Sequence, residues 1–418
     1  MKSKKILVWF RNDLRLHDNE MLVEAIAKSD SILPVYFLDP DFLEQESDGA
    51  LLKAGHNRVQ FLLESLSALR TALQKIGGNL LVISGKPEDH IQALVELYEI
   101  AEVYHHREVA TEETTVSSHV EDLLWKLKVN LKHFIGHTLY NKEDLPFPIK
   151  DIPDVFSQFK KKTERDAIVK DCFLSPECID LVEVEEWGEI PVSPIASAGP
   201  AGGEKEGIKH LLELFEPGAE IYTKSNTKVH TDKPVFSSKL SPWLALGCLS
   251  PRKVYWAIKD AERQFGGNTN FNHLILGLLW RDFFRFMFKK HNVNFFSDVL
   301  TEVNSAVTDQ DRENQLKNWK DGHTGHILVD KYMNELNQSG FISHAGRLLV
   351  ATFLIYVLKL NWIDGARYFE QKLIDYSPAS NWGNWANVAV GGKDPRSKNT
   401  FDLDKQIKML DLEVYTPF

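Results

Sequence analysis

Short apolar runs alternate with amphipathic segments along the first third of the chain. The runs are short enough for buried parallel strands and cover residues 6–10, 32–38, 80–84, 101–105 and 130–135. Between them the spacing is helical, most clearly where Val59, Leu62, Leu66 and Leu73 share one stripe that ends at Gly77. This alternation predicts an α/β domain over residues 1–140, with a five-stranded doubly wound parallel sheet and a ligand cleft at the carboxyl ends of its strands.

The pattern changes twice further along. Prolines, charge runs and the small-residue stretch 196–203 mark residues 141–206, which predicts a connector that crosses the surface. From 207 to 418 the spacing is helical, as in 274–288 and 348–358, and predicts an all-α domain. Many tryptophans lie in this half, and they either fill a large core or take part in chemistry.

Composition excludes several classes of protein. The chain has 418 residues, 43% of them apolar and 26% charged, and no window is apolar for long enough to span a membrane. Its three cysteines, Cys172, Cys178 and Cys248, form no metal or disulfide pattern, so we expect no metal and a reducing cytoplasm. No GxGxxG or P-loop motif follows a predicted strand. The net charge of -10 argues weakly against a nucleic-acid partner, although a local basic patch is compatible with it.

Two stretches carry polar groups suited to a ligand. In the first, Tyr222 to Lys224 and the hydroxyl-rich segment 236–243 precede a helix opened by Pro242, a pattern suited to a pyrophosphate. Ordinary helix capping by these hydroxyls is the more frequent explanation. In the second, Arg347, Asp375 and Asn381 stand among aromatic residues and would satisfy a nitrogen-rich ring. A salt bridge between Arg347 and Asp375 that only supports helices is an equal alternative.

Several strings resemble one family, the photolyases and cryptochromes. They are VWFRNDLRLHDN at 8–19, FSSKLSPWLALGCLSP at 236–251, LWRDFFRF at 279–286, the segment 340–347, and NWGNW at 381–385. The resemblance spans nearly the whole chain in order. The segments DLPFP at 144–148 and DVF at 154–156 are most similar to the cryptochrome DASH branch.

The resemblance implies a helical domain that holds one FAD. The phosphates and ribitol would be bound by Tyr222, Ser237, Ser238, Lys239, Leu240 and Ser241, and the isoalloxazine by Arg281, His344, Arg347, Asp375, Ser377 and Asn381. It further implies a monomer that acts on UV-damaged DNA, in single strands or loops, by lending an electron from reduced FAD to a flipped-out pyrimidine dimer. A folate or deazaflavin antenna would occupy the α/β cleft, with Glu143 as a candidate contact.

The chain also departs from the family pattern. Trp385 and Trp362 match the first two members of its electron-transfer chain, but the third position holds Asp309, so the electron would leave through Trp319 or Tyr356. In the repair pocket Trp280 remains, while the other positions hold Gly277, Ala345, Leu348 and Asn387. These changes favour an alternative, a blue-light photoreceptor with FAD and little repair activity. A third hypothesis from another class is a flavin-free helical adaptor.

Two further groups have open roles. His344 is either a proton donor beside the flavin or an ordinary hydrogen-bonded histidine. Six basic residues would rim a DNA-facing cavity or form a solvated face, and they are Arg285, Lys289, Lys290, Lys393, Arg396 and Lys398.

Overall fold

A five-stranded parallel sheet forms the first half of the molecule, as expected. The computed structural model describes residues 3–43, 53–193, 199–222, 237–292, 308–390 and 407. The strands are β1 (Lys5–Phe10), β2 (Ser31–Leu38), β3 (Leu81–Ser84), β4 (Glu102–His106) and β5 (Asn130–Phe134), in the order β3-β2-β1-β4-β5. Each lies within a residue of its predicted bounds, because an apolar run between turn residues has few other ways to be buried.

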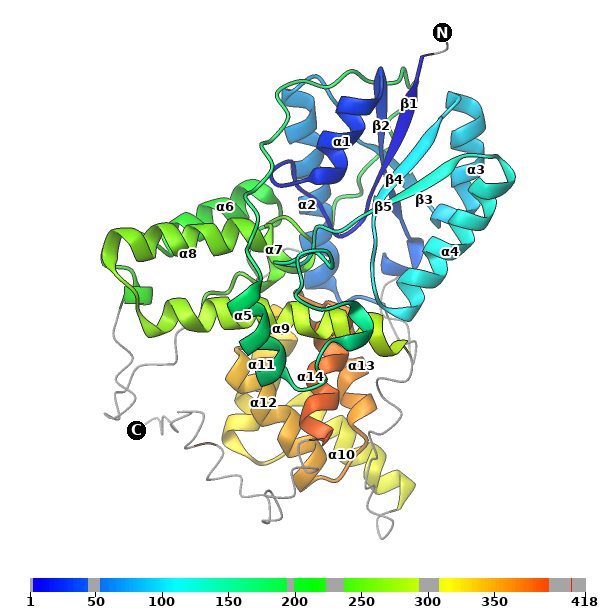
Figure 1. Cartoon of the computed structure of the whole chain (residues 1–418). Helices are drawn as coiled ribbons and strands as arrows, with labels where there is room; N and C mark the ends of the chain where they lie inside the picture. Colours follow the sequence, from blue (N-terminus) through cyan, green and yellow to red (C-terminus); the bar gives the residue numbers. More distant parts are fainter. Residues whose placement is uncertain are drawn as a thin grey trace.

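Helices cover both faces of this sheet (Figure 1). They are α1 (Glu20–Lys28), α2 (His56–Lys75), α3 (Pro87–Tyr98) and α4 (Thr111–Lys126), with the 3-10 turn η1 (Pro40–Phe42). Alternate residues of β1 point to opposite faces: Ile6, Val8 and Phe10 pack with α1 and α2, whereas Leu7 and Trp9 pack with α3 and α4. The predicted doubly wound α/β fold is confirmed.

The connector is tied to the sheet along part of its length. It contains the 3-10 turn η2 (Ile149–Asp151) and helix α5 (Phe156–Asp166). Beyond α5 it returns to the α/β part, where Leu181 forms a parallel bridge with Ile32 and the amide of Val82 donates to the carbonyl of Trp187. These backbone bonds satisfy the edge of the sheet, so the segment does more than cross the surface.

The second half is helical. Its elements are α6 (Glu204–Glu213), η3 (Glu220–Tyr222), α7 (Ser241–Ala245), α8 (Pro251–Phe265), α9 (Thr269–His291), α10 (Asp309–Asp321), α11 (Ile327–Ser339), α12 (His344–Thr352), the π-turn η5 (Phe353–Val357), α13 (Trp362–Lys372) and α14 (Pro378–Val390). Helix α9 runs between the sheet and the bundle of α10 to α14, and α6 and α8 lie to the left of them in this view (Figure 1). None of the described helices is long and apolar enough to cross a bilayer.

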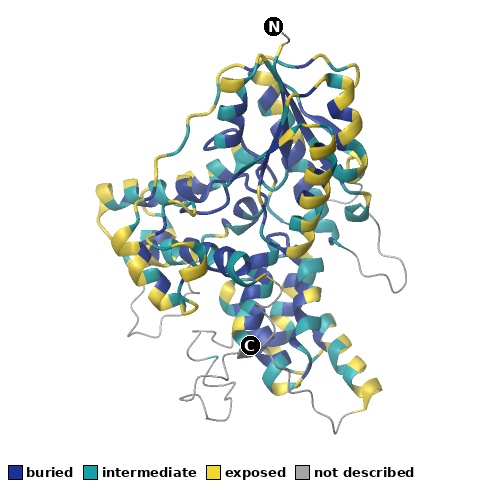
Figure 2. Ribbon diagram, turned by 45° about the vertical axis from the view of Figure 1, so that its right-hand side comes forward, coloured by how far each residue is buried: buried dark blue, intermediate teal, exposed yellow. Residues whose placement is uncertain are grey.

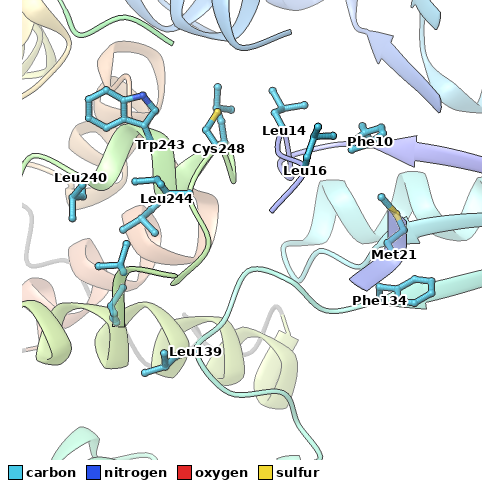
Figure 3. Packing of buried hydrophobic residues seen from close by; sticks show 14 of the residues in the cluster. Phe10, Leu14, Leu16, Met21, Phe134, Leu139, Leu240, Trp243, Leu244 and Cys248 are labelled. Atoms are coloured by element: carbon cyan, nitrogen blue, oxygen red, sulfur yellow. The ribbon is translucent and has the colours of Figure 1, made fainter. Parts of the chain in front are cut away.

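One hydrophobic core joins the two halves. Phe10, Leu14 and Leu16 at the end of β1 belong to the same buried cluster as Trp243 and Cys248 near α7 (Figure 3). The backbone packs as closely as the side chains here, since a Cβ at Gly247 would lie 2.0 Å from the carbonyl oxygen of Asn12. A separate core around Trp319 holds α10 to α14 together. Figure 2 shows both as buried residues running through the two halves.

Candidate functional site

An ion pair between the half-buried Arg347 and the buried Asp375 joins α12 to the loop after α13. Ser343 caps α12 by accepting from the amide of Gly346, which places Arg347 in its first turn. The Arg347 guanidinium donates to Oδ2 of Asp375 at 2.7 Å and to the carbonyl of Ile342 at 3.0 Å. The predicted salt bridge is therefore present.

This ion pair leaves one polar atom unsatisfied. The Asp375 side chain is 2% exposed, and its Oδ1 has no hydrogen-bond partner among the described residues. An unsatisfied buried oxygen costs roughly 1–3 kcal/mol, so a purely structural pair is an incomplete explanation. An acceptor of this kind fits the N–H group of a flavin ring.

The start of α14 lies beside this pair. Ser377 precedes the helix, and its carbonyl accepts from the amide of Asn381. The buried Asn381 side chain donates to the carbonyl of Ala366 on α13 at 3.0 Å. Helix α14 also packs closely on α9, because a Cβ at Gly383 would lie 2.4 Å from the ring of Phe284. The close contact brings the α14 residues toward Arg281.

A small polar cleft of about 10 Å³, with room for about one water molecule, lies between the sheet and these helices. It is lined by Asn12, Glu108, Glu113, His137, Ala245, Arg281, Arg285, Tyr376, Ser377 and Pro378. Arg281 donates to the carbonyls of Leu244 and His137, and no described carboxylate forms an ion pair with it. Burial and the neighbouring charge of Arg285 lower its pKa to about 10, so it still carries a positive charge at neutral pH. A cation with no direct ion-pair partner among the described residues fits an electron-rich or anionic ring.

The α/β side of the cleft contains two carboxyl groups in different states. Burial acts to raise the pKa of Glu108, but His137 and Arg285 hold it well below its usual value. Burial and the Glu108 charge raise the pKa of Glu113 to about 8, and burial lowers that of His137 to about 4. At neutral pH these shifts favour a carboxylate at Glu108, which is paired with Arg285, and a protonated carboxyl at Glu113. Sequence reasoning missed these residues, although Glu108 and Glu113 follow a predicted strand end.

The hydroxyl-rich turn does not cap its helix. Leu240 occupies the cap position of α7, and no side chain makes a cap hydrogen bond there. The carbonyl of Ser238 instead accepts from His210, and Lys239 has a φ of 51°. The hydroxyls of Ser237, Ser238 and Ser241 are therefore not used as the capping alternative requires. The Tyr222 hydroxyl donates to the carbonyl of Phe215 at 2.9 Å, and residues 223–236 lie outside the described part.

The residues expected in the repair pocket form a mixed set. Trp280 stacks on Phe156 of α5, with ring centroids 3.6 Å apart. Gly277 is exposed and a Cβ there would meet nothing within 4 Å, while Asn387 is exposed and Ala345 and Leu348 are half-buried. The face of Trp280 toward Phe156 is therefore covered by the connector.

The expected basic rim is wrong for Arg285. Its guanidinium is buried and forms an ion pair with Oε2 of Glu108 at 2.8 Å, so it does not lie on the surface. Lys290 pairs with Asp154, and Lys393, Arg396 and Lys398 lie outside the described residues. Glu143 is exposed beside Lys142 and does not line the cleft.

The aromatic residues near α14 form two contact groups. The ring centroids of Trp385 and Trp319 are 6.3 Å apart, and those of Trp319 and Tyr368 are 5.8 Å apart. The ring centroids of Trp362 and Trp382 are 5.9 Å apart, and the hydroxyl of Tyr356 donates to the carbonyl of Val388.

His344 begins α12 next to the ion pair. The residue is exposed, yet neighbouring atoms desolvate its imidazole, and together with the charge of Arg347 they lower its pKa. Its neutral form is therefore favoured at physiological pH.

Comparison with known proteins identifies the family. Residues 6–177 match the DNA photolyase model, and residues 274–415 match the FAD binding domain of DNA photolyase. Cryptochrome DASH of Synechocystis sp. is 38% identical over 97% of this chain and 85% of its own length. The chloroplastic/mitochondrial cryptochrome DASH of Arabidopsis thaliana is 36% identical, over 97% and 74%.

Solved structures agree. The Synechocystis cryptochrome has a TM-score of 0.86 at 36% identity, covering 98% of this chain and 87% of its own. A class III photolyase from Agrobacterium tumefaciens has a TM-score of 0.80 at 25% identity, covering 98% and 85%. The chain therefore belongs to the photolyase and cryptochrome family, with cryptochrome DASH among its relatives, and FAD is its cofactor.

Proposed function

We propose that this chain is a light-driven DNA-repair flavoprotein, a lyase that splits cyclobutane pyrimidine dimers in single-stranded or looped DNA. The observation that carries the proposal is the Arg347–Asp375 pair with its unsatisfied Asp375 oxygen, set beside Asn381 and the polar cleft. When bound, FAD supplies the chemistry by absorbing blue light and lending one electron to the dimer.

Different residues around the cleft would each contribute to binding the isoalloxazine ring of FAD. Asp375 offers its free oxygen to a ring N–H, and Arg347 keeps that carboxylate in place. Arg281 offers a cation, and Asn381 presents an amide that cannot lose a proton. The hydroxyls of Ser237, Ser238 and Ser241, with Lys239 and Tyr222, would bind the phosphates and ribitol.

An electron path to the ring would begin at Trp385. Trp362 is its expected successor, but Trp319 offers a second route, because it contacts both Trp385 and the half-buried Tyr368. Photoreduction of bound flavin by an external thiol would distinguish the two. If photoreduction is slower in Trp319→Phe than in Trp362→Phe, the electron uses the Trp319 route. The reverse order selects the Trp362 route.

A specific observation favours a second function, a blue-light photoreceptor with FAD and little repair activity. Phe156 covers one face of Trp280, and Gly277 offers no carboxylate to a damaged base. Both features weaken the binding of a flipped-out dimer. The flavin-free adaptor is set aside by the FAD-binding domain match.

One experiment separates the two functions. The FAD-loaded protein is illuminated with blue light in the presence of a single-stranded oligonucleotide that contains a thymine dimer, and restored monomers are counted. Light-dependent restoration supports repair. No restoration by the wild type, together with gain of activity in Phe156→Ala, shows that the covered tryptophan limits an otherwise competent site. No restoration by either, with a light-induced change of oligomer or partner, selects the photoreceptor.

An antenna pigment remains a proposal for the cleft side of the sheet. A folate or deazaflavin would be bound at the carboxyl ends of the strands, at a site separate from the polar cleft, and Glu143, its expected contact, is exposed and does not line that cleft. An absorption band of purified protein beyond that of FAD would show it. The monomeric state and the cytoplasmic location also remain predictions, checked by size-exclusion chromatography and by imaging.

A further inference from the structure

The first turn of α2 binds the ends of two helices in the other half of the molecule. The amide of Gly55 donates to the carbonyl of Gln371 at 2.6 Å, and the Asn57 side chain donates to that of Gln338 at 3.0 Å. Arg58 donates to the carbonyl of Glu370 at 2.9 Å. Figure 1 shows α2 extending from the sheet toward this bundle. The last carbonyls of a helix lack partners within it, so these three donors cap α11 and α13 from outside.

The two capped ends lead directly to the ion pair. Asp375 follows the end of α13 at Lys372, and Gly340 follows the end of α11 at Ser339. The two segments bind each other, since the amide of Ile374 donates to the carbonyl of Gly340 at 2.9 Å. A Cβ at Gly340, whose φ is 70°, would lie 2.9 Å from the carbonyl oxygen of Lys372. Any shift of these ends would therefore move Asp375.

Arg58 makes a second contact with this loop. Its guanidinium lies 4.5 Å from the centre of the Tyr376 ring and 5.2 Å from that of Phe42. Tyr376 is the residue after Asp375 and lines the polar cleft. A guanidinium that both donates to a carbonyl and stacks on a ring holds the loop in one orientation. None of Gly55, Asn57 and Arg58 lines the cleft itself.

We infer that Gly55, Asn57 and Arg58, here called the α2 clamp, position Asp375 for FAD. The α/β half is then part of the flavin site although it contributes these residues only indirectly. The inference rests on the proposed role of Asp375 toward the ring. If the clamp is lost, the loop 373–377 samples more conformations, and FAD must order it on binding, which weakens affinity.

The chain offers a matched control on the same helix. Arg70 of α2 also donates to backbone carbonyls, those of Leu80, Trp187 and Gly188, and all three lie away from the bundle. The variants Arg58→Met and Arg70→Met therefore remove the same kind of contact from the two ends of one helix. Only the first touches the loop that carries Asp375.

Two readouts test the clamp. One is the dissociation constant of FAD for the apoprotein, and the other is hydrogen exchange of the Ile374 amide in the apoprotein, which needs no bound flavin. We expect Arg58→Met to weaken FAD about tenfold and to speed exchange at Ile374, while Arg70→Met leaves both unchanged. Arg58→Lys, which keeps a cation and one donor, should recover most of the affinity.

Four outcomes decide the inference. Unchanged affinity in Arg58→Met overturns it. Equal weakening by both variants, in proportion to their loss of stability, also overturns it, because the effect is then general. If Arg58→Met does not fold, Asn57→Ala removes a single donor and must weaken FAD by itself. Asp375→Asn separates the two claims: wild-type affinity there removes the proposed flavin role and the clamp with it, whereas weakening there but not in Arg58→Met removes the clamp alone.

Discussion

Two buried aspartates, each paired with an arginine, stabilise different parts of this molecule in different ways. Asp18, in the loop after β1, receives two hydrogen bonds from Arg252 at 2.6 and 3.0 Å, one from the hydroxyl of Ser250 and one from the amide of Phe173 at 3.1 Å. Asp375 receives one bond, from Arg347, and its other oxygen has no partner among the described residues. Both carboxylates are almost fully inaccessible.

The difference is the one expected between a structural site and the proposed flavin-binding site. Asp18 joins the β1 loop, the connector and α8, and the protein itself satisfies both of its oxygens. A fully satisfied buried pair resists changes and needs no ligand. At Asp375 the protein supplies half of what the carboxylate needs, and the remaining half is available to FAD.

The largest expected effect is on stability at the saturated pair. Asp18→Ala leaves Arg252 buried without its counter-charge, which typically costs about 3–5 kcal/mol. Urea unfolding of the apoprotein measures this loss. The folded fraction should bind FAD with wild-type affinity, and a parallel loss of affinity would show that the two sites are not separable.

At the open pair the effect should fall on the ligand instead. Asp375→Asn keeps the shape but removes the charged acceptor, so FAD affinity should fall about 10- to 100-fold, since one charge-assisted hydrogen bond contributes roughly 1.5–3 kcal/mol. Reconstitution of the apoprotein with FAD, followed by fluorescence, gives the constant. Apoprotein stability should fall by less than in Asp18→Ala, because Arg347 is partly exposed to solvent and keeps its hydrogen bond to the carbonyl of Ile342. A large stability loss with unchanged affinity would reverse the comparison.

A third carboxyl, that of the half-buried Glu113, extends the comparison to pH. Its pKa is raised to about 8 by burial and by Glu108, above the ordinary 4.5. The unfolded chain loses this proton near its ordinary pKa while the folded chain keeps it, so stability falls as pH rises from about 4.5 to 8. Partial exposure limits the effect to on the order of 1–2 kcal/mol. Unfolding midpoints at the two ends of this range should converge in Glu113→Gln, and an unchanged pH slope would assign it to other groups.

The smallest effect tests how far the saturated pair depends on each donor. Ser250→Ala removes one hydroxyl from Asp18, but Arg252 and the amide of Phe173 remain. We expect a loss of about 1 kcal/mol or less. Thermal melts of Ser250→Ala and Asp18→Ala side by side give the ratio, and equal losses would mean that the hydroxyl, not the guanidinium, stabilises the joint.

Local pattern was enough for the α/β half. The apolar runs gave strands within a residue of their bounds, because strand periodicity and turn residues are properties of neighbouring positions. The helical half followed from the same kind of pattern, and the family strings placed Arg347, Asp375 and Asn381 near one site. Arg285 shows where local pattern is insufficient. Its charge suggested a surface role, but the structure shows that it is buried in an ion pair with Glu108.

The sequence by itself therefore determined the sheet and the helical half, which depend on residue types at fixed spacing, and its resemblance to photolyases and cryptochromes implied the family and the cofactor. Only the tertiary structure decided which polar atoms are satisfied. The sequence suggested the pair of Arg347 and Asp375, but it showed neither the unpartnered Asp375 oxygen nor the pairing of Asp18 with Arg252, which lies far away along the chain. The stacking of Phe156 on Trp280 and the hydrogen bond from the start of α2 to Gln371 were likewise visible only in the structure. Such contacts depend on how distant segments pack together, and no local pattern encodes that packing.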